Sequence, residues 1–244
     1  MTHYIFRIAS KITTEEIQYF LITSIIAGFI LSLKAWGTTI YQFLDGFTNF
    51  VFFTIVFIVL QIIFIYAQKI FAAFKGYECS YKIWLYGPAI GLLISFISYG
   101  WIPFLYLGTV ELKPINRFTL GKFRGQHIRT DDLMLVGLAG PIAVYFVMLL
   151  LVPLYIVTGI GLIKTILVVG AAIIFFSSLP LPRTNGINVI LYSRTGWLIY
   201  FIFSLMFLAL IAPLNAYAYV VAVILTIIVV WLIKKYWVDY LHSL

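Results

Sequence analysis

Side chains that bind metals or carry protons are scarce in this chain of 244 residues. It has three histidines, His3, His127 and His242, and a single cysteine, Cys79. No two histidines lie four residues apart on one helix, the spacing at which two imidazoles reach the same zinc ion. The sequence therefore predicts no zinc site, and we expect the protein to work without a cofactor.

The acidic residues lie where membrane chemistry does not need them. All eight fall at the ends of long apolar runs or in the polar segments between them: Glu15, Glu16, Asp45, Glu78, Glu111, Asp131, Asp132 and Asp239. A carboxylate within an apolar run would be the first candidate for a general base or a proton-coupling group. The pattern argues against an intramembrane aspartyl protease and against an ion-coupled transporter.

The composition is that of a multi-span membrane protein. The mean hydropathy is +1.09, and 64% of the residues are hydrophobic. A membrane-spanning helix needs about 20 apolar residues, so one domain covering residues 1–244 has room for six or seven helices. We expect an all-α, multi-pass protein of the cell membrane. The net charge of +8 is spread over short polar segments, which suits lipid headgroups better than nucleic acid.

The apolar runs define the expected spans. They cover residues 17–34, 50–74, 133–157, 164–179, 196–213 and 216–233. The stretch 84–107 is interrupted by Gly87-Pro88, Gly100 and Pro103, and it is interpreted as either a kinked span or a re-entrant pair. Its Gly87-x-x-x-Gly91 spacing suits close packing against another helix.

Two local signals mark element ends. Thr13 and Glu16 have the spacing of a capping box that opens the first helix. Gly76 is suited to the position after a helix C-terminus, and aromatic and polar residues alternate over 77–83. We therefore expect a short strand at residues 77–83.

The segment from Phe64 to Trp84 resembles the active-site helix of the site-2 proteases, which are zinc-dependent intramembrane proteases. Three later stretches are similar to motifs of that family in the same order: Gly108-Thr-Val110, Ala139-Gly140-Pro141, and Pro180-Leu-Pro182 followed by Asn185-Gly186. The start at Thr13 is similar to archaeal members. The resemblance implies a site-2-protease-like core at about residues 50–190, with extra helices at 13–34 and 196–234.

The resemblance also implies that the catalytic groups are replaced. The two His and the Glu of the family's H-E-x-x-H motif fall on Phe64, Ile65 and Gln68, its Asn falls on Val144, and its third zinc ligand, an Asp, falls on Asn185. Phe, Ile and Val cannot bind a metal, and the amides of Gln and Asn are poor zinc ligands. These positions predict an inactive relative, a pseudoprotease.

Such a protein would retain client recognition without hydrolysis. In the family, a locally extended membrane segment pairs with a strand edge, so we expect Gly108, Val110, Asn185 and Gly186 to contact a client. The partner would be a membrane-protein client or an active paralogue. Two alternatives remain open: an active metallopeptidase with an unconventional metal site, for which His127 could be a displaced ligand, and a transporter or channel.

Overall fold

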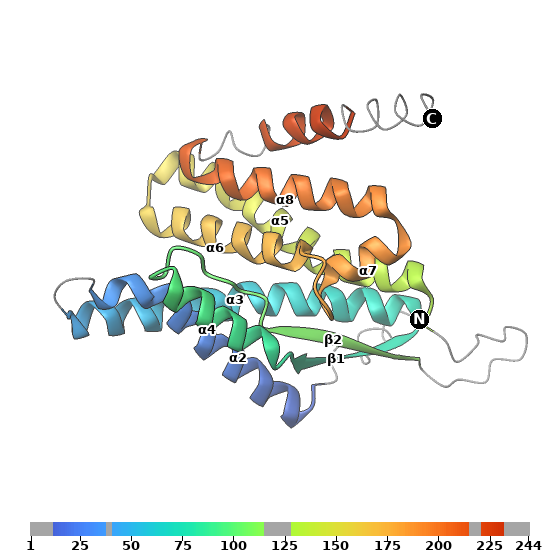
Figure 1. Ribbon diagram of the computed structural model, residues 1–244, viewed down its shortest axis with the longest axis horizontal. Coiled ribbons are helices and arrows are strands. Elements are labelled where there is room, and N and C mark those ends of the chain that lie inside the picture. Colours follow the sequence, from blue (N-terminus) through green and yellow to red (C-terminus); the bar gives the residue numbers. More distant parts are fainter. Residues whose placement is uncertain (1–11, 38–40, 115–127, 215–220, 232–244) are drawn as a thin grey trace, which may run out of the picture.

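The computed structural model describes residues 12–37, 41–114, 128–214 and 221–231. This part of the chain is mostly helical, with one two-stranded sheet (Figure 1). The three histidines lie outside the described residues, so the structure does not test the expectation for His127. The all-α membrane class predicted from the sequence agrees with this architecture.

Five of the described helices are long and apolar enough to cross a membrane. They are α2 (Thr14–Ser32) with its 3-10 extension η1 (Leu33–Trp36), α3 (Phe43–Lys75), α5 (Thr130–Thr158), α6 (Gly161–Ser178) and α8 (Arg194–Leu214). The sequence predicted six or seven. The difference lies in residues 84–107, which contain only a short helix, and in the last run, of which residues 221–231 are described as helix.

The stretch 84–107 turns back on itself. It forms α4 (Tyr86–Ile97), which is followed by a turn and a non-helical return segment, residues 102–107. A 12-residue helix is too short to cross a bilayer, so the re-entrant interpretation describes this stretch better than a kinked span.

Small residues on α4 allow the return segment to come close. A Cβ on Gly87 would lie 2.6 Å from the Tyr106 carbonyl oxygen, and one on Gly91 would lie 3.0 Å from the Phe104 carbonyl oxygen. The sequence predicted that these glycines pack against another helix. Their nearest backbone neighbour is instead an extended segment, although Ile30 of α2 also contacts Gly91.

The sheet begins where α3 ends. Gly76 adopts a left-handed conformation with φ of 83° and closes the helix through its own N–H. Strand β1 (Tyr77–Ile83) follows directly and pairs antiparallel with β2 (Gly108–Pro114). Both the helix-ending glycine and the strand at 77–83 are therefore confirmed. The second strand includes the predicted Gly-x-Val stretch.

The outer edge of β2 is set by the pairing register. The N–H of Trp84 donates to the Leu107 carbonyl at 3.2 Å, and these residues are the next pair along the ladder. Hydrogen-bonded and non-hydrogen-bonded pairs alternate in antiparallel sheets. Gly108 and Val110 therefore belong to non-hydrogen-bonded pairs, and their backbone N–H and C=O groups point away from β1.

Helix α3 forms the centre of the molecule. In Figure 1, α2, α4 and the sheet lie on one side of it, and α5, α6, α7 (Asn185–Tyr192) and α8 lie on the other. Glycines permit the closest approaches: a Cβ on Gly28 would overlap Thr54 of α3, and one on Gly170 would lie 2.5 Å from the Met148 sulfur. Small residues at such crossings are typical of helices that pack within membranes.

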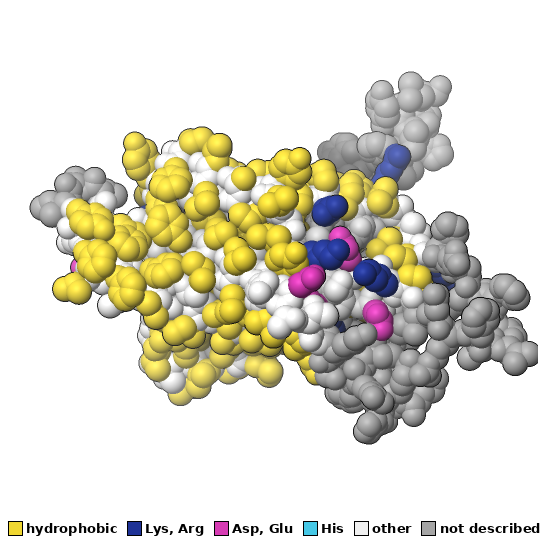
Figure 2. Space-filling view, turned by 90° about the horizontal axis from the view of Figure 1, so that it is seen from below, with side chains coloured by type: hydrophobic (Ala, Val, Ile, Leu, Met, Phe, Trp, Pro, Cys, Tyr) yellow, Lys and Arg dark blue, Asp and Glu magenta, His cyan; other side chains and the backbone are white. Residues whose placement is uncertain are grey.

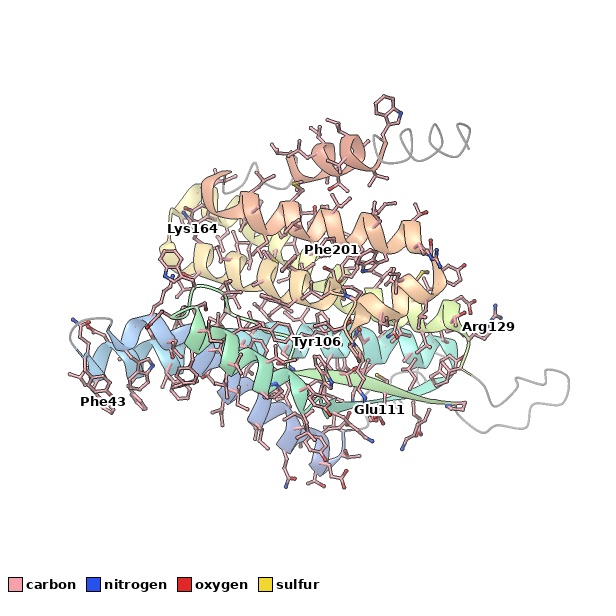
Figure 3. The ribbon with its side chains drawn as sticks, in the orientation of Figure 1. Phe43, Tyr106, Glu111, Arg129, Lys164 and Phe201 are labelled. Atoms are coloured by element: carbon pink, nitrogen blue, oxygen red, sulfur yellow. The ribbon has the colours of Figure 1, made fainter. Side chains whose placement is uncertain are left out.

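The surface separates apolar and charged side chains. Figure 2 shows hydrophobic side chains over most of one face, with most of the Lys, Arg, Asp and Glu side chains in the right-hand part of the view. Figure 3 places Phe43 at one end of the molecule, Glu111 and Arg129 toward the other, and Tyr106 between them. Large exposed apolar side chains are normal when lipid is the solvent.

Candidate functional site

Gln68 and Asn185 meet in the interior. They are 117 residues apart in the sequence, yet Nε2 of Gln68 donates to Oδ1 of Asn185 at 3.3 Å. Each side chain is only 1% exposed. Helix α3 supplies Gln68, and the first residue of α7 supplies Asn185. Two of the positions singled out in the sequence are therefore adjacent, and they are linked by neutral amides.

A proline in α5 frees the second partner of Gln68. Pro141 lies inside the helix and lacks an N–H, so it cannot donate to the carbonyl of Gly137 four residues earlier. Nε2 of Gln68 donates to that carbonyl at 3.4 Å. The sequence placed Pro141 near a helix start, but α5 begins at Thr130. The interior proline thus creates the acceptor that fixes the Gln68 amide.

The other positions singled out by the resemblance are filled by hydrophobic packing. Phe64 and Ile65 are each 8% exposed, and Val144 is fully buried in the same core cluster. A Cβ on Gly140 would lie 2.9 Å from the Phe64 ring, so the glycine makes room for the aromatic side chain. At these three positions the structure provides apolar contacts and no group that could bind a metal.

A small cavity separates α3 from the return segment and β2. Its volume is about 30 Å³. Its lining includes the Phe64, Ile65 and Gln68 side chains, the predicted client contacts Gly108 and Val110, and Ile173 of α6. Two groups of residues that were singled out for different reasons therefore line one cavity, which lies beside the outward-facing edge of β2.

Gly186, one of the predicted client contacts, packs against the end of α6. It is buried, and a Cβ there would overlap the carbonyl oxygens of Ser178 and Leu179 at the end of α6. Thr184 holds the same turn by donating from Oγ1 to the Leu179 carbonyl at 2.5 Å. The structure gives Gly186 a packing role between α6 and α7.

Two hydroxyl groups join this turn to β2 and to the return segment. The carbonyl of Arg183 accepts hydrogen bonds from Thr109 Oγ1 at 2.7 Å and from the Tyr106 hydroxyl at 3.2 Å. Arg183 has a φ of 66°, an uncommon conformation for a residue with a side chain. These bonds position the turn that carries Asn185 beside the cavity.

A buried ion pair, which the sequence did not reveal, covers the opposite edge of the sheet. Lys69 Nζ lies 2.9 Å from Glu16 Oε1, and both side chains are nearly buried. Glu16 also accepts the N–H of Tyr81 at 2.6 Å and the N–H of Thr13 at 3.1 Å. The predicted capping box is present, but Glu16 also joins α2 to α3 and to the outer edge of β1.

A second polar group was also missed. Gln61 of α3 donates from Nε2 to the Tyr81 hydroxyl at 2.6 Å, and that hydroxyl donates to Thr23 Oγ1 at 3.1 Å. Burial raises the pKa of Tyr81 to about 12, so the phenol keeps its proton. The only sequence signal was a glutamine in an apolar run.

No group of three or more His, Cys, Asp or Glu side chains in the described ranges could hold a metal ion. Comparison with protein-family models, with characterised proteins and with solved structures finds no match.

Proposed function

We propose that this chain is a catalytically inactive membrane protein, related to the site-2 proteases, that binds client transmembrane segments in the cell membrane. Its client would be a membrane protein with a locally unwound, extended segment. Binding would shelter the client, retain it or present it to another protein, without cleaving it.

The Gln68–Asn185 hydrogen bond is the observation that carries this proposal. By resemblance, these residues occupy the positions of two zinc ligands, and the structure brings them within 3.3 Å of each other. A random pair of positions 117 residues apart has no reason to meet. Their side chains are uncharged, and a neutral amide oxygen binds zinc poorly compared with imidazole, thiolate or carboxylate.

The two sheet edges support client binding on one side only. Glu16 accepts the Tyr81 N–H on the outer edge of β1, so that edge is capped at its centre. On β2, the outward N–H and C=O groups of Val110 have no hydrogen-bond partner elsewhere in the described chain. An unpaired strand edge accepts an extended segment as an added strand.

The test removes one backbone donor. Val110→Pro deletes the outward N–H, but it deletes no bond to β1, because Val110 belongs to a non-hydrogen-bonded pair. Val110→Ala shortens the side chain and keeps the N–H, so it serves as the matched control. A photo-crosslinking amino acid at Lys113, which is exposed on β2, would report captured membrane proteins.

We expect crosslinked membrane clients with the wild type and with Val110→Ala, and a strong loss with Val110→Pro. Equal crosslinking by all three proteins would reject strand addition at this edge. An absence of clients above a control carrying a scrambled first span would reject client binding.

A further inference from the structure

Gln61 is a buried amide whose oxygen is unsatisfied. Its side chain is 8% exposed, and Nε2 is occupied by the Tyr81 hydroxyl. Oε1 has no hydrogen-bond partner among the described residues. Buried polar groups without partners are rare in folded proteins because they lose water and gain nothing in return. A ligand that supplied a donor here would therefore gain binding energy.

Gln61 belongs to the cavity lining. The same cavity is lined by Gln68, which lies two helical turns further along α3, and by Gly108 and Val110 of β2. A strand added to β2 would run past this cavity, and alternate side chains of the strand would point toward α3.

The cavity is small, which favours a small entering side chain. Its volume is about 30 Å³, which is enough for a water-sized polar group. Serine and threonine are small and bring a hydroxyl donor, whereas leucine and phenylalanine are larger and bring none.

We propose that Gln61 selects clients that carry a small hydroxyl side chain, serine or threonine, in the segment added to β2. The client hydroxyl donates to Gln61 Oε1. This inference rests on the proposed client binding and names the class of client that the site takes. Gln61 acts as a specificity-determining residue, because a client without the hydroxyl leaves the buried oxygen unpaired.

Two synthetic peptides that differ by one group test the selection. Each is a transmembrane peptide of about 24 residues, rich in Leu and Ala, with paired lysines at both ends. One has a central Gly-Thr-Gly, and the other has Gly-Val-Gly. Threonine and valine have the same shape, so only the hydroxyl differs. Binding to the full chain is measured in detergent micelles by energy transfer between labels.

We expect the wild type to prefer the threonine peptide by about tenfold, the effect of one hydrogen bond to a buried acceptor. Gln61→Met removes the amide and should abolish the preference. Gln18→Met, at an exposed position of α2, should keep it. The two-peptide comparison on the wild type needs no variant, so it remains decisive if Gln61→Met folds poorly.

The outcomes separate the two proposals. Equal binding of both peptides by the wild type would overturn the selection by Gln61 and leave client binding in place. A threonine preference that survives in Gln61→Met would also overturn it. If the wild type binds neither peptide, client binding itself fails, and the selection fails with it.

Discussion

The buried charges of Glu16 and Lys69 make a sharp prediction about stability. Glu16→Gln keeps the shape of the side chain, and glutamine also completes a capping box. Its single amide oxygen can accept either the N–H of Tyr81 or the N–H of Thr13, which bond to different carboxylate oxygens in the wild type. The substitution therefore removes the negative charge and one of these two acceptor oxygens, and it takes the carboxylate away from the buried Lys69 ammonium.

The expected cost follows from burial. The two side chains are 6% and 7% exposed, and removing one partner of a buried ion pair costs about 3–5 kcal/mol. In a chain of this size, each kcal/mol lowers the melting temperature by roughly 2–4 °C, so we expect a drop of about 10 °C. Lys69→Met should cost a similar amount. The double variant should be more stable than the sum of the two losses predicts, by about 2 kcal/mol.

Thermal unfolding in detergent micelles, followed by tryptophan fluorescence, measures these effects. The matched control is the pair of Lys82 and Glu111, in which Nζ lies 2.7 Å from Oε2. Their side chains are 41% and 35% exposed. Lys82→Met should leave the melting temperature close to that of the wild type, since water screens exposed charges. A Glu16→Gln variant that melts at the wild-type temperature, or equal losses from the exposed and buried pairs, would contradict a stabilising role of the buried pair.

Three further predictions concern single positions. Burial raises the pKa of Cys79 to about 12, so the thiol stays protonated near neutral pH. Its alkylation rate should still rise with pH above about pH 10, where the rate for an ordinary thiol no longer changes. A rate that becomes constant near about pH 9 would contradict this. Gly186→Ala should lower the free energy of unfolding by about 2–3 kcal/mol, and the melting temperature with it, because the added Cβ overlaps backbone carbonyl oxygens. Gly161→Ala should leave both unchanged, because nothing lies within 4 Å of its Cβ. Equal effects of the two substitutions would count against the packing described. Thr109→Val should cost about 1–2 kcal/mol by removing the shorter hydrogen bond to the Arg183 carbonyl, and chemical unfolding that matches the wild type would show that this bond contributes nothing.

The features that the sequence predicted well depend on local chemistry. Gly76 could be identified as a helix end because a left-handed residue without a Cβ is common there, and the strand at 77–83 followed from its alternating pattern. The long apolar runs identified the spanning helices because hydrophobicity is also a local property of the sequence. Their ends moved outward by several residues, as with α3, which begins at Phe43, because polar residues also fit the first turns of a helix.

The features that the sequence missed depend on contacts between distant residues. Glu16 had a sufficient local explanation in the capping box, and Lys69 is 53 residues away, so neither suggested an ion pair. Gln61 gave no sign of its partner Tyr81 on the sheet. For residues 84–107, glycines and prolines predicted an interruption, but only the packing of Gly87 against the return segment decides between a kinked span and a chain that turns back.

The zinc content of the detergent-purified protein tests the central claim most directly. If Gln68 and Asn185 are amides that replace metal ligands, the wild type should carry far less than one zinc per chain, and Gln68→Ala and Asn185→Ala should leave that content unchanged. About one zinc per chain, lost in either variant, would contradict the account and identify an active metallopeptidase with an unconventional site.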